Sequence, residues 1–159
     1  MHSAVKLIVC LAVCFAAAGL GGLATSSVTS DWYAGLNKPS FQPPGWLFGP
    51  AWTVLYTLMA IALFLVWRSG AAPSLVRPAL VVFAIQLVLN VLWSVLFFAV
   101  KQPMLGLIEI VLLWVAILLT IVRFLPVSRV AAILMVPYIL WVSFATVLNA
   151  AIVVLNRRS

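Results

Sequence analysis

The sequence DWYAGLNKPSFQPPGWLFGPAWTVLY, residues 31–56, concentrates rings and prolines in one stretch. It holds three of the seven tryptophans, two of the three tyrosines and four of the nine prolines of the chain. Its first part connects two long apolar runs. Proline fixes φ and removes a backbone donor, so such a connector loses little conformational entropy when a ligand binds. The pattern indicates either a structured lid over a binding site or an aromatic belt at the bilayer interface, and we weigh the two equally. Trp46 taken alone is typical of such a belt.

The composition excludes a soluble globular protein. The chain has 159 residues, of which 67% are hydrophobic and 7% charged, and its length indicates one domain, residues 1–159. The formal net charge of +7 would suit nucleic acid, but the nine lysines and arginines stand singly at the ends of apolar runs. They form no basic stripe and are typical of anchors at a membrane interface. We therefore expect a lipid bilayer as partner and no nucleic acid.

Five apolar runs are each long enough to cross a bilayer, which takes about 20 residues of helix. They comprise residues 4–25, 45–67, 79–100, 104–122 and 130–155. The sequence thus predicts an all-α membrane protein, a bundle of five transmembrane helices with the structured first loop as a lid. Residues 68–78 are expected to form a loop because of their glycine and prolines, and Pro137 should bend the fifth helix.

The first apolar run allows two interpretations. Its basic start and small residues near the end resemble a secretory signal peptide, but its length suits a retained helix as well. Two pairs, Ala17 with Gly21 and Ala18 with Gly22, have the small-xxx-small spacing that lets helices approach closely. The same small residues could instead leave room for a ligand.

Polar side chains inside the third run share one face. Gln86, Asn90, Trp93 and Phe97 recur at helical spacing. Amides are costly in lipid unless partnered, so this face should look into the bundle. For Asn90 we weigh hydrogen bonding between helices and contact with a ligand equally, and for Gln86 we favour the structural role.

Glu109 is the only acidic residue within an apolar run. A carboxyl group in a membrane helix is a candidate for function by default. Because Glu109 lies less than two turns inside its run, we expect it to pair with Lys101 or to reach the interface rather than to carry protons.

The motifs of common catalytic chemistry are missing from the sequence. His2 is the only histidine, and Cys10 and Cys14 are too few to hold a metal, so we expect no metal site and no cofactor. The chain offers instead rings that could line a cavity for flat apolar ligands, with Asn90 to orient them. An aromatic helix-bundle core is the alternative. The rings are those of Trp32, Tyr33, Trp52, Tyr56, Trp93, Tyr138 and Trp141.

Three motifs in order resemble the TspO/translocator protein family, also called tryptophan-rich sensory proteins. They are WYAGLNKP with PPGWLFGPAWTVLY, QLVLN at residues 86–90, and PYILWVSFATVLN at residues 137–149. The resemblance implies a five-helix bundle with its first helix retained, in the bacterial cell membrane and as a homodimer. It also implies an integral membrane receptor that binds porphyrins or related flat hydrophobic ligands beneath the first loop. A light-dependent enzyme that degrades protoporphyrin and a tetrapyrrole or sterol transporter are the alternatives.

The resemblance also assigns residues. Trp52, Asn90 and Trp141 correspond to ligand contacts of the family, and Trp32 and Tyr33 to residues of its lid. Trp52 and Trp141 would be the catalytic residues if photodegradation occurs. The full set of expected ligand-binding residues is Trp32, Tyr33, Trp52, Tyr56, Asn90, Trp93, Tyr138, Trp141 and Ala145.

Three positions depart from the family pattern. Phe41 replaces a tryptophan of the first loop, and Leu105 stands where animal members have a tryptophan. Ala150 and Ala151 occupy the place of the aromatic residues in the animal sterol motif. We therefore expect low affinity for sterols, although such motifs are weak predictors even when complete.

Overall fold

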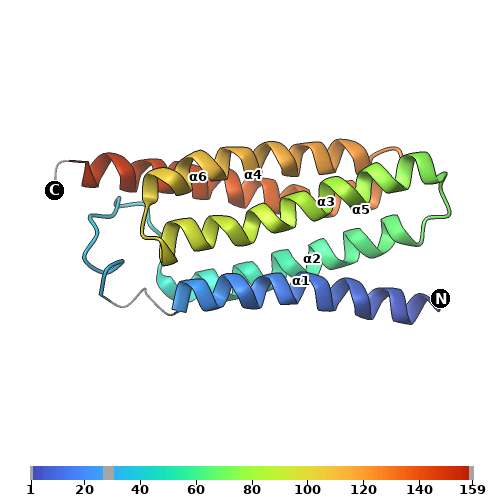
Figure 1. The fold of residues 1–159 in the computed structure, drawn as a ribbon, viewed down its shortest axis with the longest axis horizontal. Coiled ribbons are helices and arrows are strands. Elements are labelled where there is room, and N and C mark those ends of the chain that lie inside the picture. Colours follow the sequence, from blue (N-terminus) through green and yellow to red (C-terminus); the bar gives the residue numbers. More distant parts are fainter. Residues whose placement is uncertain (1, 27–30, 158–159) are drawn as a thin grey trace.

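The computed structural model describes residues 2–26 and 31–157, and its helices form one elongated bundle (Figure 1). Five segments in the described residues have the length and hydropathy of membrane spans: Ser3–Thr25, Gly45–Trp67, Pro73–Ala99, Pro103–Phe124 and Arg129–Asn156. This confirms the predicted all-α bundle of five transmembrane helices. The elements are α1 (Ser3–Ser26), η1 (Gly45–Leu47), α2 (Phe48–Trp67), α3 (Pro73–Ser94), η2 (Val95–Ala99), α4 (Pro103–Phe124), α5 (Arg129–Leu134) and α6 (Val136–Asn156).

Successive spans run in opposite directions, so α1 begins at one end of the bundle and α6 finishes at the other (Figure 1). The first loop lies at the end where α6 finishes, together with the turn between η2 and α4. The helices that pack most extensively against each other are α3 with α4, α1 with α2 and α4 with α6. The first loop is therefore placed over the ends of the helices that carry the predicted aromatic face.

The third helix begins earlier than predicted. It starts at Pro73 and contains Pro78, which we had expected to belong to the preceding loop. A proline at the first helical position loses no helical hydrogen bond, and one further along removes only a single bond. The loop before α3 is consequently short and includes Gly70, whose φ of 70° suits glycine.

Pro137 interrupts the fifth span as predicted. Helix α5 finishes at Leu134, Met135 lies in a turn, and α6 begins at Val136 with the proline in its first two positions. Ser128 caps the start of α5, where its side chain accepts a hydrogen bond of 3.2 Å from the backbone N–H of Ala131.

Helix α3 ends in a π turn, η2. Its wider winding is marked by the N–H of Val100, which donates to the carbonyl of Val95, five residues earlier, at 2.8 Å. Lys101, with a φ of 58°, then reverses the chain into α4. The π turn carries Phe97 and Phe98, whose ring centroids lie 4.8 Å apart.

The small residues of α1 serve two purposes. Cys10, Cys14, Ala17 and Gly21 are buried in the bundle, and a Cβ on Gly21 would lie 3.3 Å from the Ser94 hydroxyl of α3. This is the close approach predicted for Ala17 and Gly21. The neighbouring pair behaves differently, because a Cβ on Gly22 would meet no atom within 4 Å.

We predict that Gly106→Ala lowers the thermal stability of the protein in detergent, measured by circular dichroism. A Cβ there would lie 3.2 Å from both Asn149 Oδ1 and Phe97 Cδ2, so α4 could no longer approach α6 and η2 as closely. Gly19→Ala is the matched control, since its Cβ would meet nothing within 4 Å. Equal melting temperatures for the two variants would contradict the close packing at Gly106.

Candidate functional site

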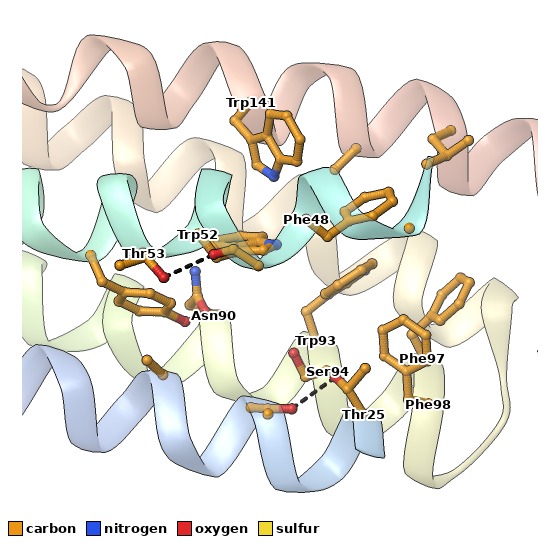
Figure 2. A pocket seen from close by; sticks show the side chains of 18 of the residues that line it. Thr25, Phe48, Trp52, Thr53, Asn90, Trp93, Ser94, Phe97, Phe98 and Trp141 are labelled. Atoms are coloured by element: carbon orange, nitrogen blue, oxygen red, sulfur yellow. Dashed lines mark hydrogen bonds between the residues drawn. The ribbon is translucent and has the colours of Figure 1, made fainter. Parts of the chain in front are cut away.

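A cavity of about 830 Å³ lies at the loop end of the bundle (Figure 2). Its volume falls in the range of pockets that bind small molecules. Helices α1, α2, α3 and α6, η2 and the first loop all contribute to its walls. The lining residues are Phe15, Ala18, Gly19, Gly21, Gly22, Thr25, Tyr33, Gln42, Gly45, Phe48, Gly49, Trp52, Thr53, Tyr56, Asn90, Trp93, Ser94, Phe97, Phe98, Trp141, Ala145, Leu148, Asn149 and Ile152.

One wall is built from rings of α2 and α6. Phe48, Trp52 and Tyr56 are spaced by four residues, so they project from the same face of α2. The Trp141 ring of α6 meets that of Phe48 at 5.9 Å and that of Trp52 at 6.3 Å between centroids, both edge to face. These are favourable geometries for aromatic pairs, and they fix flat surfaces at steep angles to one another.

The opposite wall comes from the end of α3. The Trp93 ring stacks on Phe97 of the π turn with centroids 5.3 Å apart and planes 28° apart. The indole N–H of Trp93 donates to Asn149 Oδ1 at 3.1 Å, and the Asn149 amide donates in turn to the Pro103 carbonyl at 2.9 Å. The amide of Asn149 thus fixes the indole and ties α6 to the start of α4.

Asn90 forms the polar floor of the cavity and is 3% exposed. The Tyr56 hydroxyl donates to Asn90 Oδ1 at 2.6 Å, and Asn90 Nδ2 donates to the Tyr138 hydroxyl at 2.6 Å. The amide therefore connects α2, α3 and α6. Of the two roles that we weighed for Asn90, the structure shows the hydrogen bonding between helices, and it also places the residue in the cavity lining.

Gln86 has the structural role that we favoured, hydrogen bonding between helices, but the bond that it makes is weak. It lies one turn deeper and does not line the cavity. Its Nε2 lies 3.8 Å from the Met59 sulfur, and its Oε1 has no hydrogen-bond partner among the described residues.

Residues of the first loop pack on the same end of the bundle. The rings of Trp32 and Tyr33 lie 6.0 and 6.3 Å from Phe97 between centroids. The backbone N–H of Asn37 donates to Asn156 Oδ1 at 3.0 Å, and the Asn156 amide returns a bond of 2.9 Å to the Asn37 carbonyl. Trp46, in contrast, is 72% exposed, as a residue of an interfacial belt would be.

The phenol of Tyr33 stays neutral where the loop meets the cavity. Burial raises its pKa above the usual range, while the hydrogen bond that Gln42 Nε2 donates to its hydroxyl at 3.1 Å opposes that rise. The ammonium group of Lys38 lies over the Tyr33 ring, with its Nζ 4.6 Å from the ring centroid.

The match between this sequence and the TspO/MBR family covers residues 10–155. The chain belongs to the TspO/MBR family. It is 45% identical to the tryptophan-rich protein TspO of Chlorobaculum tepidum, over 94% of this chain and 95% of that one. The protein of the same name from Archaeoglobus fulgidus is 43% identical, over 95% and 97% of the two chains. The human translocator protein is 41% identical, over 74% of this chain and 70% of its own.

Membership of the TspO/MBR family, together with five helices able to span a bilayer, makes this a multi-pass membrane protein. It also agrees with the interpretation of residues 4–25 as a retained helix, because the family match begins at residue 10, inside α1.

The structure brings together seven of the nine expected binding residues, which line the cavity: Tyr33, Trp52, Tyr56, Asn90, Trp93, Trp141 and Ala145. Trp32 and Tyr138 are not among the lining residues. Tyr138 is fully buried and bonded to Asn90, with its ring 6.4 Å from that of Trp52, and Trp32 packs edge to face on Phe97. Both support rings of the lining instead.

Sequence reasoning missed two contributions to the cavity. The first is Asn149, whose position one turn beyond Ala145 on the same face of α6 was the available signal. The second is the wall of small residues from α1, for which the spacing allowed both close packing and open space: Gly21 packs against Ser94, whereas Gly22 borders the cavity with no atom within 4 Å of its Cβ position.

The expectation that Glu109 pairs with Lys101 or reaches the interface is wrong. Its side chain is 4% exposed, and neither carboxyl oxygen has a hydrogen-bond partner among the described residues, while Lys101 is exposed. Glu109 is one of the buried residues of α4, a helix that packs mainly against α3 and α6, so it is held inside the bundle. The described residues also contain no group of three potential metal ligands.

We predict that Asn90→Leu lowers the free energy of unfolding by about 1–3 kcal/mol, because it leaves two buried tyrosine hydroxyls without their partner. Gln86→Leu is the matched control on the same helix. It removes an amide whose oxygen has no partner among the described residues, and we expect it to be neutral or stabilising. Unfolding in mixed detergent micelles measures both, and equal losses would contradict the role assigned to Asn90.

Proposed function

We propose that this protein is a membrane receptor for porphyrins or related flat hydrophobic ligands, which bind in the aromatic cavity. The observation that carries the proposal is the pair of ring walls, from Trp52 with Trp141 and from Trp93 with Phe97, above the amide of Asn90. Flat apolar ligands gain from stacking on such walls, and one fixed polar group is enough to orient them.

The ligand chemistry follows from the lining. Among the described lining residues, none carries a charge at neutral pH, and the polar groups are amides, hydroxyls and indole N–H groups. A macrocycle with ring nitrogens can hydrogen-bond to these neutral polar groups and matches the lining better than a highly charged molecule does. Ionised substituents of such a ligand would have to remain outside the cavity, since an unpaired charge is costly in an apolar site.

The first loop acts as the lid of this site in our proposal. Its rings rest on Phe97 and Phe98, Phe41 packs against Phe144 of α6, and Asn37 bonds reciprocally with Asn156. These contacts hold the described part of the loop on the bundle, so binding would require little further ordering of it.

The relatives' names are compatible with a receptor. The tryptophan-rich sensory protein of Cereibacter sphaeroides is 36% identical to this chain, over 92% of it and 88% of the relative. We include a homodimer in the proposal, as the resemblance to bacterial members implies, to be tested by the mass of the purified protein.

We predict that Trp52→Ala or Trp141→Ala weakens binding of protoporphyrin in the dark by about 1–3 kcal/mol each, the contribution typical of one stacked aromatic side chain. Titration of the porphyrin absorbance band with purified protein measures the affinity. Trp67→Ala is the matched control, because Trp67 lies at the other end of α2, next to Lys6. Equal loss in all three variants would mean general unfolding, and no loss in the first two would contradict the proposed site.

A second function, light-dependent degradation of porphyrin, is favoured by the indoles of the cavity wall, those of Trp52, Trp93 and Trp141. Light-excited porphyrin can take an electron from a nearby indole and pass it to dissolved dioxygen, and the reactive oxygen that forms can then oxidise the porphyrin ring. The chain has only two acidic residues and one histidine, and none of the three lines the cavity, so turnover should not proceed in the dark.

We predict that Trp141→Phe retains most of the affinity, because ring area is preserved, but slows the loss of bound porphyrin under light. Absorbance decay of the complex under constant illumination measures this, with a dark sample beside it. Degradation at the wild-type rate in Trp141→Phe, Trp52→Phe and Trp93→Phe alike would assign any photochemistry to the ligand and leave the receptor function alone.

A further inference from the structure

Most sides of the cavity are closed by packing. The lining residues Asn90, Phe97, Leu148, Asn149 and Ile152 are buried against neighbouring elements. At the loop end, the ring of Tyr33 rests on Phe97 and Phe98. A ligand therefore has no clear path between α3, η2 and α6, or beneath the described part of the first loop.

The side between α1 and the start of α2 is different. The lining residues Gly19, Gly22, Gly45, Gly49 and Thr53 belong to these two elements and η1, and all five are exposed on the surface of the bundle. A Cβ added to any of the four glycines would meet no atom within 4 Å. These residues border an opening, which we call the α1–α2 opening.

The opening is confined to the loop half of the two helices. Further along, the Phe15 and Tyr56 rings lie 6.3 Å apart, and Lys6 Nζ lies 3.5 Å from the Trp67 carbonyl, so α1 and α2 are packed together there. Since the opening lies within the spans Ser3–Thr25 and Gly45–Trp67, it faces lipid near one interface of the bilayer.

We propose that ligands reach the cavity sideways from the bilayer through the α1–α2 opening, and that its glycines set the width of flat molecule that can pass. This inference rests on the proposed receptor function and adds the source and physical class of its ligands. They are molecules that dissolve in lipid with a flat apolar body and lie near the interface with any ionised groups toward water.

The chemistry of the rim fits such a passage. The hydroxyls of Thr25 and Thr53 each donate to a carbonyl of their own helix, to Gly21 and Gly49 respectively, both at 2.8 Å. A passing apolar face therefore meets hydroxyls already bonded to the backbone, together with glycine surface. A route from water would instead have to displace the first loop.

The test separates access from affinity. Gly22→Leu on α1 and Gly49→Leu on α2 would narrow the opening, and both replace glycine by a better helix former at a position where a Cβ meets no atom within 4 Å. We expect the association rate and the dissociation rate of protoporphyrin IX each to fall by about tenfold. The rates are measured by stopped-flow absorbance with protein in phosphatidylcholine vesicles. The smaller change Gly22→Ala should give a smaller effect in the same direction.

The matched control is Ala12→Leu, a change on α1 at an exposed position that does not line the cavity, which should keep the wild-type rates. Circular dichroism in the same vesicles checks that each variant is folded. Diluting the porphyrin with more lipid at constant volume should slow association in the wild type, because the ligand arrives from the bilayer.

Three results would overturn the inference. Wild-type rates in both leucine variants would place the route elsewhere, and weaker affinity with unchanged association would make these glycines part of the pocket wall only. Association that ignores lipid dilution would indicate a route from water. Failure of the wild type to bind porphyrin at all would instead refute the proposed function, a result distinct from these three.

Discussion

The amide of Asn90 is the interaction on which the cavity depends. In a bundle surrounded by lipid, apolar contacts between helices are only slightly better than contacts with lipid tails, so the few buried hydrogen bonds have a large share in fixing the arrangement. One amide bonds hydroxyls from α2 and α6 at 2.6 Å each and thereby sets how far apart three helices stand. The two tyrosines then hold the neighbouring indole of Trp52 at the edge of open space.

A large cavity in a helix bundle normally lowers stability, because its lining loses dispersion contacts. Here the walls are rings that support one another from behind. Trp93 is held by Asn149 and by stacking on Phe97, and Trp141 is held between Phe48 and Phe144. Rigid side chains of this kind have few rotatable bonds, so they can border empty space without collapsing into it.

The sequence was sufficient to predict the number of spans and the faces of α2 and α3, because bilayer thickness and helical period act on every residue of a span. Positions that depend on a single local exception were missed. Pro78 lies inside α3 because one lost backbone bond is tolerated, and Glu109 is buried without a partner among the described residues, which pairing rules cannot anticipate. Gly19 and Gly22 of α1 line the cavity because no neighbouring element lies within 4 Å of their Cβ positions, which is a property of the assembled bundle and not of α1.

The π turn at the end of α3 makes the cavity depend on the exact number of residues in this segment. This segment holds one residue more than a regular α-helical turn would. The extra residue brings the successive phenylalanines Phe97 and Phe98 onto the cavity side. A single-residue deletion there would restore ordinary α winding, so that Phe97 and Phe98 could no longer both face the cavity. Residues 95–99 should therefore tolerate exchange of side chains far better than any change in their number, so that in this part of the molecule chain length is itself a determinant of the site.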